Sequence, residues 1–181
     1  MQKIALIGNP NCGKTTLFNV LTGANQKVGN WPGVTVEKKF GYFKLENESI
    51  ELVDLPGIYS LELDYSGIGG EIAQDYLEQD GIDLIINIVD ATNLERSLVL
   101  TQQLMERDVP MLLVMNMLDV AEQQGITVST SMLADKLQLP VIEMIASQKR
   151  GIDELCSKLT RKINSAPETV SKNESQQPLA I

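Results

Sequence analysis

The sequence of 181 residues contains no histidine. Its absence excludes every mechanism in which an imidazole acts as a base, a nucleophile or a metal ligand. Cysteine is almost as scarce, because the chain has only Cys12 and Cys156. Two cysteines exclude a zinc site built from cysteine alone and a scaffold held together by many disulfides.

Positive charge and long apolar runs are also scarce. Lysine and arginine number 15 against 24 aspartates and glutamates, so the formal net charge is −9. This balance argues against a protein that coats nucleic acid, and against binding to an anionic membrane by charge alone. The most apolar stretch, residues 82–89, is interrupted by Asp83 and Asn87 and is far shorter than the roughly 20 residues of a membrane span. We expect this chain by itself to be soluble and cytoplasmic.

Short apolar runs alternate with helical patterns along the chain. This alternation predicts a doubly wound α/β fold with about six strands, parallel except for one antiparallel edge strand, and about five helices. The antiparallel part is predicted from two strand-like runs, residues 36–45 and 50–54, joined by a polar turn. Residues 25–34 and 57–70 are rich in glycine and are predicted to be irregular functional loops. We expect one domain over residues 1–164 and a disordered polar tail or linker over residues 165–181.

The strongest motif follows the first predicted strand. Residues 8–15, Gly-Asn-Pro-Asn-Cys-Gly-Lys-Thr, match G-x-x-x-x-G-K-[ST] and open a predicted helix. Glycines let successive backbone N–H groups curl round phosphate oxygens, and the helix N-terminus adds positive potential. Lys14 is predicted to reach the terminal phosphates, and the Thr15 hydroxyl can bind Mg²⁺.

Three further motifs stand at the ends of predicted strands. Asp54-Leu55-Pro56-Gly57 offers a carboxylate that can hold Mg²⁺ through water and a glycine N–H for the γ-phosphate. Residues 116–119, Asn-Met-Leu-Asp, place Asp119 where it can accept two N–H bonds from guanine, and Asn116 is predicted to tie this loop to the phosphate loop. Residues 146–147, Ala-Ser, offer a backbone N–H for guanine O6. Each of these motifs is weak when taken alone.

Together and in this order, the four motifs resemble the guanine-nucleotide motif set of the small GTPases. Four strings resemble those of one branch, the N-terminal G domains of FeoB, the bacterial ferrous iron transport proteins. They are residues 8–15, residues 30–37 (Asn-Trp-Pro-Gly-Val-Thr-Val-Glu), residues 54–61 (Asp-Leu-Pro-Gly-Ile-Tyr-Ser-Leu) and residues 116–119. Met117 stands where most GTPases have a lysine. Methionine is common at this position in the FeoB branch, and the loss of the lysine suggests weaker nucleotide affinity.

The resemblance implies a role for each matching residue. It implies that Thr35 binds Mg²⁺ and senses the γ-phosphate, and that Asn11, with the backbone carbonyls of Asn30 and Trp31, binds K⁺. Ile58 stands where many GTPases have a glutamine that orients the attacking water, so slow intrinsic hydrolysis is expected. A monovalent cation beside the phosphates can offset the charge that develops during the reaction.

The candidate site residues fall into three groups. The expected catalytic residues are Asn11, Lys14, Thr35 and Gly57. The expected nucleotide contacts are Gly8, Asn9, Pro10, Asn11, Cys12, Gly13, Lys14, Thr15, Thr16, Gly33, Val34, Thr35, Asp54, Leu55, Pro56, Gly57, Asn116, Met117, Asp119, Ala146 and Ser147. The expected metal ligands are Thr15, Thr35 and Asp54 for Mg²⁺, with Asp54 acting through water, and Asn11, Asn30 and Trp31 for K⁺.

The resemblance implies a GTPase that binds GTP, GDP, Mg²⁺ and K⁺ and that regulates or powers ferrous iron uptake. It implies a helical regulatory domain and a transmembrane permease as partners in a longer protein, on the cytoplasmic face of the bacterial inner membrane. Three alternatives stay open: a binding module whose nucleotide state gates a partner, an ATP-binding protein, and a potassium-dependent GTPase that serves ribosomes or tRNA modification.

Three further side chains allow more than one interpretation. Cys12 is interpreted as a small loop residue rather than a redox thiol, and Cys156 as part of the core. Trp31 either anchors a partner or packs over the nucleotide, unless it is simply exposed to solvent.

Overall fold

Seven strands form one sheet in the computed structural model, which describes residues 1–79 and 81–165. The strand order is β2-β3-β4-β1-β5-β6-β7. The parallel part comprises β4 (Glu48–Asp54), β1 (Gln2–Gly8), β5 (Leu84–Asp90), β6 (Met111–Asn116) and β7 (Val141–Glu143). The doubly wound α/β prediction is therefore confirmed.

The antiparallel part lies at one edge, as predicted, but it contains an additional strand. β3 (Glu37–Leu45) runs antiparallel to β4, and β2 (Gln26–Asn30) pairs antiparallel to β3 as the outermost strand. The prediction of an irregular loop over residues 25–34 is thus wrong for this segment. β2 has a single large apolar residue, Val28, which is exposed, so pairing with β3 rather than a hydrophobic pattern makes it a strand.

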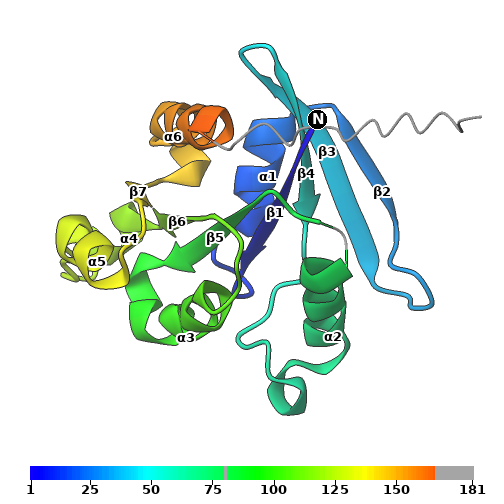
Figure 1. The fold of residues 1–181 in the computed structure, drawn as a ribbon. Helices are drawn as coiled ribbons and strands as arrows, with labels where there is room; N and C mark the ends of the chain where they lie inside the picture. Colours follow the sequence, from blue (N-terminus) through cyan, green and yellow to red (C-terminus); the bar gives the residue numbers. More distant parts are fainter. Residues whose placement is uncertain (80, 166–181) are drawn as a thin grey trace, which may run out of the picture.

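Six α-helices in the described residues cover both faces of the sheet (Figure 1). α1 (Lys14–Thr22) and α6 (Ile152–Ser165) pack on one face. The other face carries α2 (Leu63–Gln79), α3 (Leu94–Met105), α4 (Leu118–Gln123) and α5 (Thr130–Leu137). Two short 3-10 helices, Ala91–Asn93 and Ala146–Gln148, follow β5 and β7 closely in the chain.

The core follows the alternation of side chains along the strands. In β1, Ile4 and Leu6 face α1 and α6, whereas Ala5 and Ile7 face α2 and α3, and all four are buried. Because both faces are covered, the central strands β1, β5 and β6 are mostly apolar, as is typical of a parallel sheet. Cys156 on α6 packs against the buried cluster that contains Ile4 and Leu6, which agrees with its interpretation as a core residue.

The second predicted loop, residues 57–70, is also partly regular. Only residues 57–62 lie outside helix, because α2 begins at Leu63. Gly67 interrupts α2 with non-helical angles of φ 55° and ψ −157°. It is one of three glycines in this part of α2, and their low helix propensity explains why the sequence did not predict a helix here. Residues 166–181, most of the predicted tail, lie outside the described residues. None of the helices described has the length and hydropathy needed to cross a bilayer.

Candidate functional site

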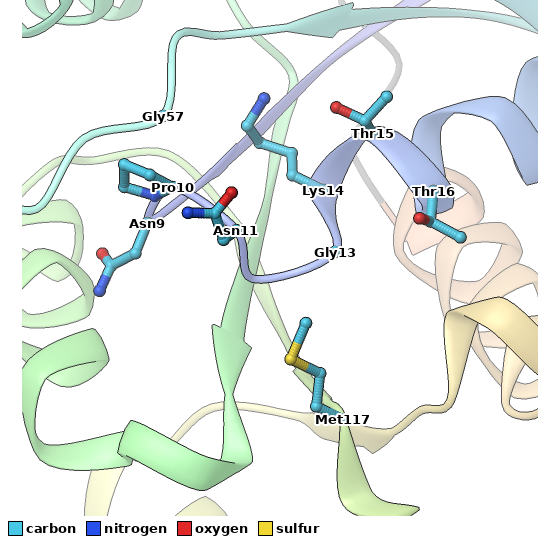
Figure 2. A pocket seen from close by; sticks show the side chains of 9 residues that line it. All are labelled: Asn9, Pro10, Asn11, Gly13, Lys14, Thr15, Thr16, Gly57 and Met117. Carbon is cyan, nitrogen blue, oxygen red and sulfur yellow. The ribbon is translucent and has the colours of Figure 1, made fainter. Parts of the chain in front are cut away.

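A pocket of about 560 Å³ opens where β1 ends and α1 begins. It is lined by Asn9, Pro10, Asn11, Gly13, Lys14, Thr15, Thr16, Gly57 and Met117 (Figure 2). Seven of these nine residues belong to the predicted phosphate loop and the residue after it. Figure 2 shows the loop curving past Asn11 to Lys14 and Thr15, with Met117 pointing toward it from the connection after β6.

The loop needs glycine at a specific position. Gly13 has φ +92°, and a Cβ there would lie 2.1 Å from Nδ2 of Asn116. Any other residue would therefore suffer both backbone strain and a collision. Asn11 also has a positive φ of 63°, which asparagine tolerates better than most residues. This backbone path lines the pocket and leads into the first turn of α1.

Asn116 joins three of the predicted motifs through its side-chain amide. Its Nδ2 donates to the backbone carbonyl of Cys12 at 3.0 Å, and its Oδ1 accepts from the backbone N–H of Ala146 at 2.9 Å. The asparagine itself is 4% exposed. One buried side chain thus fixes the phosphate loop, the end of β6 and the segment after β7 relative to one another.

Lys14 and Asp54 form an ion pair inside the site. Lys14 Nζ contacts Asp54 Oδ1, and both side chains are largely buried. Burial raises the pKa of the Asp54 carboxyl, and the charge of Lys14 partly opposes that rise. The residues predicted to bind phosphate and Mg²⁺ are therefore already adjacent, and each balances the charge of the other.

The end of the motif Asp54-Leu55-Pro56-Gly57 also reaches the phosphate loop. A Cβ on Gly57 would lie 3.2 Å from the Cα of Pro10, so this glycine permits a close backbone approach. Ile58 N–H donates to the carbonyl of Gly8 at 3.1 Å. Leu55 is fully buried and belongs to the core, so its side chain does not line the pocket. Ile58 is also buried and has no group that could orient water.

The structure does not bring residues 30–35 to the pocket. Asn30 ends β2, and Gly33, Val34 and Thr35 lie in the connection to β3; none of them lines the pocket. Within this connection, Trp31 N–H donates to Val36 O at 2.9 Å, and Val34 N–H donates to Trp31 O at 3.3 Å. The predicted K⁺ and Mg²⁺ ligands of this segment therefore lie outside the pocket that Asn11 and Thr15 line.

Trp31 corrects the interpretations drawn from the sequence. It is only 5% exposed, and its ring packs edge-on against Tyr76 of α2, with centroids 5.3 Å apart. Lys38 Nζ lies 4.5 Å from the Trp31 ring centroid and 5.3 Å from that of Tyr76. The indole is neither exposed nor over the pocket, but holds the β2–β3 connection against α2. Lys38 and Tyr76 were missed because nothing in their sequence surroundings links them to residues 30–37.

The base side of the site is less enclosed. Met117 has a left-handed backbone, φ 64°, and its side chain lines the pocket. Asp119 is half-buried in the first turn of α4, Ala146 is buried, and Ser147 is exposed. None of these three lines the pocket, whose boundary ends at Met117.

The donor chemistry around the pocket fits a cation that binds through few protein ligands. No cluster of three or more histidine, cysteine, aspartate or glutamate side chains occurs in residues 1–79 and 81–165. Thr15 and Asp54 supply a hydroxyl and a carboxylate, which suits Mg²⁺ because this ion keeps several waters and uses substrate phosphates. Burial raises the pKa of the Cys12 thiol to about 11, which favours the small loop residue over a redox thiol.

Comparisons with known proteins agree with this geometry. A family model described as ferrous iron transport protein B matches residues 2–159. The chain belongs to this family. The FeoB resemblance seen in the sequence is therefore confirmed. The Fe(2+) transporter FeoB of Salmonella typhimurium is 47% identical over 178 residues, which are 97% of this chain and 23% of the transporter. The chain thus spans about a quarter or less of the curated relatives it matches.

Solved FeoB structures share the fold. The G domain of T. maritima FeoB superposes with a TM-score of 0.83 at 42% identity, covering 90% of this chain and 99% of that one. An S. thermophilus NFeoB variant bound to GDP gives a TM-score of 0.82 at 49% identity, covering 89% of this chain and 61% of that one. The fold is therefore that of FeoB G domains.

Proposed function

We propose that the chain binds GTP and hydrolyses it to GDP and phosphate. The observation that carries this proposal is the Asn116 amide, which fastens the phosphate loop to both segments expected to read guanine. A phosphate loop alone fits any nucleotide, whereas its fixed relation to Asp119 and Ala146 favours guanine. The GDP bound to the S. thermophilus relative supports the same nucleotide class.

The pocket residues divide the work of binding. The backbone N–H groups of residues 11–15 and the N-terminus of α1 would cradle the phosphates, and Lys14 would turn from Asp54 toward the terminal phosphate. Thr15 and Asp54 would hold Mg²⁺, Asp54 through water, and the bound ion would neutralise charge on the phosphates. Asp119 accepts two N–H bonds from guanine beside Met117.

Hydrolysis by this site is expected to be slow without a monovalent cation. Ile58 can neither donate nor accept a hydrogen bond, so backbone groups of residues 57–61 and of the β2–β3 connection must position the attacking water. Asn11 lines the pocket and would hold K⁺, whose charge would assist where an arginine does in other GTPases. Thr35 and the carbonyls of Asn30 and Trp31 complete the site only after their segment moves.

In the longer relatives, this nucleotide cycle would regulate or power ferrous iron uptake. The relatives are named Fe(2+) transporters, and this chain spans only a part of them. We infer that the remainder supplies the helical regulatory domain and the transmembrane permease, with this chain on the cytoplasmic side of the inner membrane. The FeoB family match favours this role over a GTPase of ribosomes or tRNA modification.

A switch function is compatible with catalysis and has its own structural support. Trp31 and Tyr76 connect the β2–β3 connection with α2, so a movement of one segment changes the packing of the other. Segments of this kind can be ordered by a γ-phosphate and released on hydrolysis. A turnover far below one per second, with a large rearrangement of both segments, would favour the switch as the principal role.

Phosphate release from GTP and ATP tests the proposal. We expect release from GTP with Mg²⁺, faster in KCl than in NaCl, and none above background from ATP. The Asn11→Ala variant should lose the difference between KCl and NaCl. Tighter binding of ADP than of GDP would contradict the guanine assignment, and equal rates in the two salts would contradict the potassium assignment.

A further inference from the structure

The segment between Gly57 and α2 is tethered to α3 rather than free. Gln103 of α3 accepts a hydrogen bond from the backbone N–H of Leu61 at 2.7 Å through Oε1. Its Nε2 donates to Ser60 Oγ at 2.9 Å, and Ser60 Oγ also lies 3.2 Å from Oε1. A weaker contact of 3.5 Å joins Nε2 to Glu62 Oε1. One side chain thus engages three consecutive residues, 60–62.

Neighbouring contacts complete the attachment of this segment. Ser60 Oγ accepts from the backbone N–H of Glu62 at 3.0 Å, which makes a local turn. The guanidinium of Arg96, two turns before Gln103 on α3, lies 3.7 Å from the ring centroid of Tyr59. Ile58 N–H is bonded to Gly8 of the phosphate loop. Residues 58–62 are therefore attached on one side to the phosphate loop and on the other to α3.

The chemistry of the site makes this attachment important. Because Ile58 cannot orient water, the backbone near Gly57 must do so, and a backbone group is only as well placed as the segment that carries it. Ser60 and Leu61 are each 8% exposed, so their polar groups have little access to solvent as an alternative partner. The amide of Gln103 is the side chain that satisfies them.

We propose that Gln103 is a positioning residue for GTP hydrolysis, which it supports by holding residues 60–62 so that the backbone at Gly57 keeps its place beside the phosphate loop. This inference rests on the proposed GTPase function. The hydrogen bonds described for Gln103 go to residues 60–62, and neither these residues nor Gln103 line the nucleotide pocket. Its removal should therefore affect the rate of the chemical step and leave nucleotide affinity intact.

The test compares Gln103→Ala with Gln102→Ala, a matched change of the adjacent and exposed glutamine on the same helix. We expect Gln103→Ala to lower kcat about ten-fold, with KM for GTP and Kd for GDP changed less than about two-fold. Gln102→Ala should match the unchanged chain. Gln103→Glu should fall between them, because it keeps an acceptor for Leu61 N–H and loses the donor to Ser60 and Glu62.

Two further measurements separate positioning from a loss of folding. The amide of Leu61 should exchange with deuterium faster in Gln103→Ala, while those of α1 keep their protection. In the double variant Ser60→Ala with Gln103→Ala, the loss of kcat should be smaller than the product of the two single losses, because both changes break the contact between Gln103 and Ser60. Additive losses in that double variant would contradict the proposed coupling.

The outcomes are distinguishable from a failure of the proposed function. No turnover of GTP by the unchanged chain would overturn both the function and this inference. Turnover that Gln103→Ala leaves unaltered would overturn this inference alone. Parallel losses of kcat, GDP affinity and thermal stability in Gln103→Ala would show a general structural role and would also overturn it.

Discussion

The phosphate loop and the β2–β3 connection are expected to meet the same nucleotide, yet the fold treats them differently. The loop is fixed from several sides, by Asn116, by Ile58 N–H and by the start of α1. The β2–β3 connection is held outside the pocket by Trp31 against α2. From this difference we propose that a nucleoside diphosphate binds to the phosphate loop as it stands, whereas hydrolysis requires the β2–β3 connection to move.

The largest effect is expected from removing the positive charge of Lys14 from the phosphate loop. Lys14→Ala should weaken GDP binding by at least about 100-fold, because a charge-assisted contact to phosphate is lost from a largely buried site. Lys44→Ala, an exposed lysine near the hairpin tip, should leave affinity unchanged. Isothermal titration with GDP measures both. Unaltered affinity in Lys14→Ala would show that the phosphate loop is not the binding element.

The second effect concerns selectivity for the base. Asp119→Ala should reduce the preference for GDP over ADP about 100-fold, since the alanine cannot accept the two guanine N–H bonds. Competition between the two diphosphates measures this ratio directly. The control is Asp135→Ala, an exposed carboxylate on α5. A ratio that stays the same would place guanine recognition elsewhere.

Thr35→Ala probes the region that must move. We expect the rate of GTP hydrolysis to fall at least about ten-fold, because a Mg²⁺ ligand is lost in the closed state. GDP affinity should change less than about two-fold, since Thr35 does not line the pocket. Thr127→Ala, at an exposed position, is the control for both measurements. A large loss of GDP affinity would show instead that the β2–β3 connection already contacts the bound GDP.

A smaller effect is expected in the pH dependence of stability. Burial raises the pKa of Asp54 in the folded chain above its ordinary value of 3.8. The folded state therefore holds this proton more tightly than the unfolded state does, and its stability falls as pH rises from about 3.8 through the folded pKa. Urea unfolding of the nucleotide-free chain and of Asp54→Asn, between pH 3.5 and 7, should show a flatter profile for the variant. A steeper fall of stability with rising pH in Asp54→Asn than in the unchanged chain would contradict the raised pKa of Asp54.

Much of the fold and of the assembled site could be predicted from local sequence patterns. Parallel strands appear as apolar runs because both of their faces are buried, and the phosphate-loop spacing is a direct consequence of the turn between β1 and α1. Asn116 was predicted to tie its loop to the phosphate loop, and the structure places its amide on Cys12 O. Such features depend on neighbours in sequence or on strand ends that meet in any doubly wound sheet.

The remaining features depend on pairings that no local pattern encodes. β2 is a strand because β3 lies beside it, and α2 begins before a glycine that interrupts it at Gly67. Trp31 packs against Tyr76 and Lys38, which lie 45 and 7 residues away from it in the chain. Both residues stand on other elements, whose approach follows from tertiary packing. The same holds for Gln103. In the sequence it is a polar residue on an amphipathic helix, and only the folded structure places it beside residues 60–62.

The fluorescence of Trp31 tests the central comparison most directly, because it is the only tryptophan in the chain and belongs to the β2–β3 connection. Titration with GDP should saturate binding and leave the emission of Trp31 unaltered. A non-hydrolysable GTP analogue with Mg²⁺ and K⁺ should change that emission, because we expect Thr35 to reach the pocket only when Trp31 leaves its packing against Tyr76. An equal change with GDP, or saturating binding of the analogue with no change, would contradict the account.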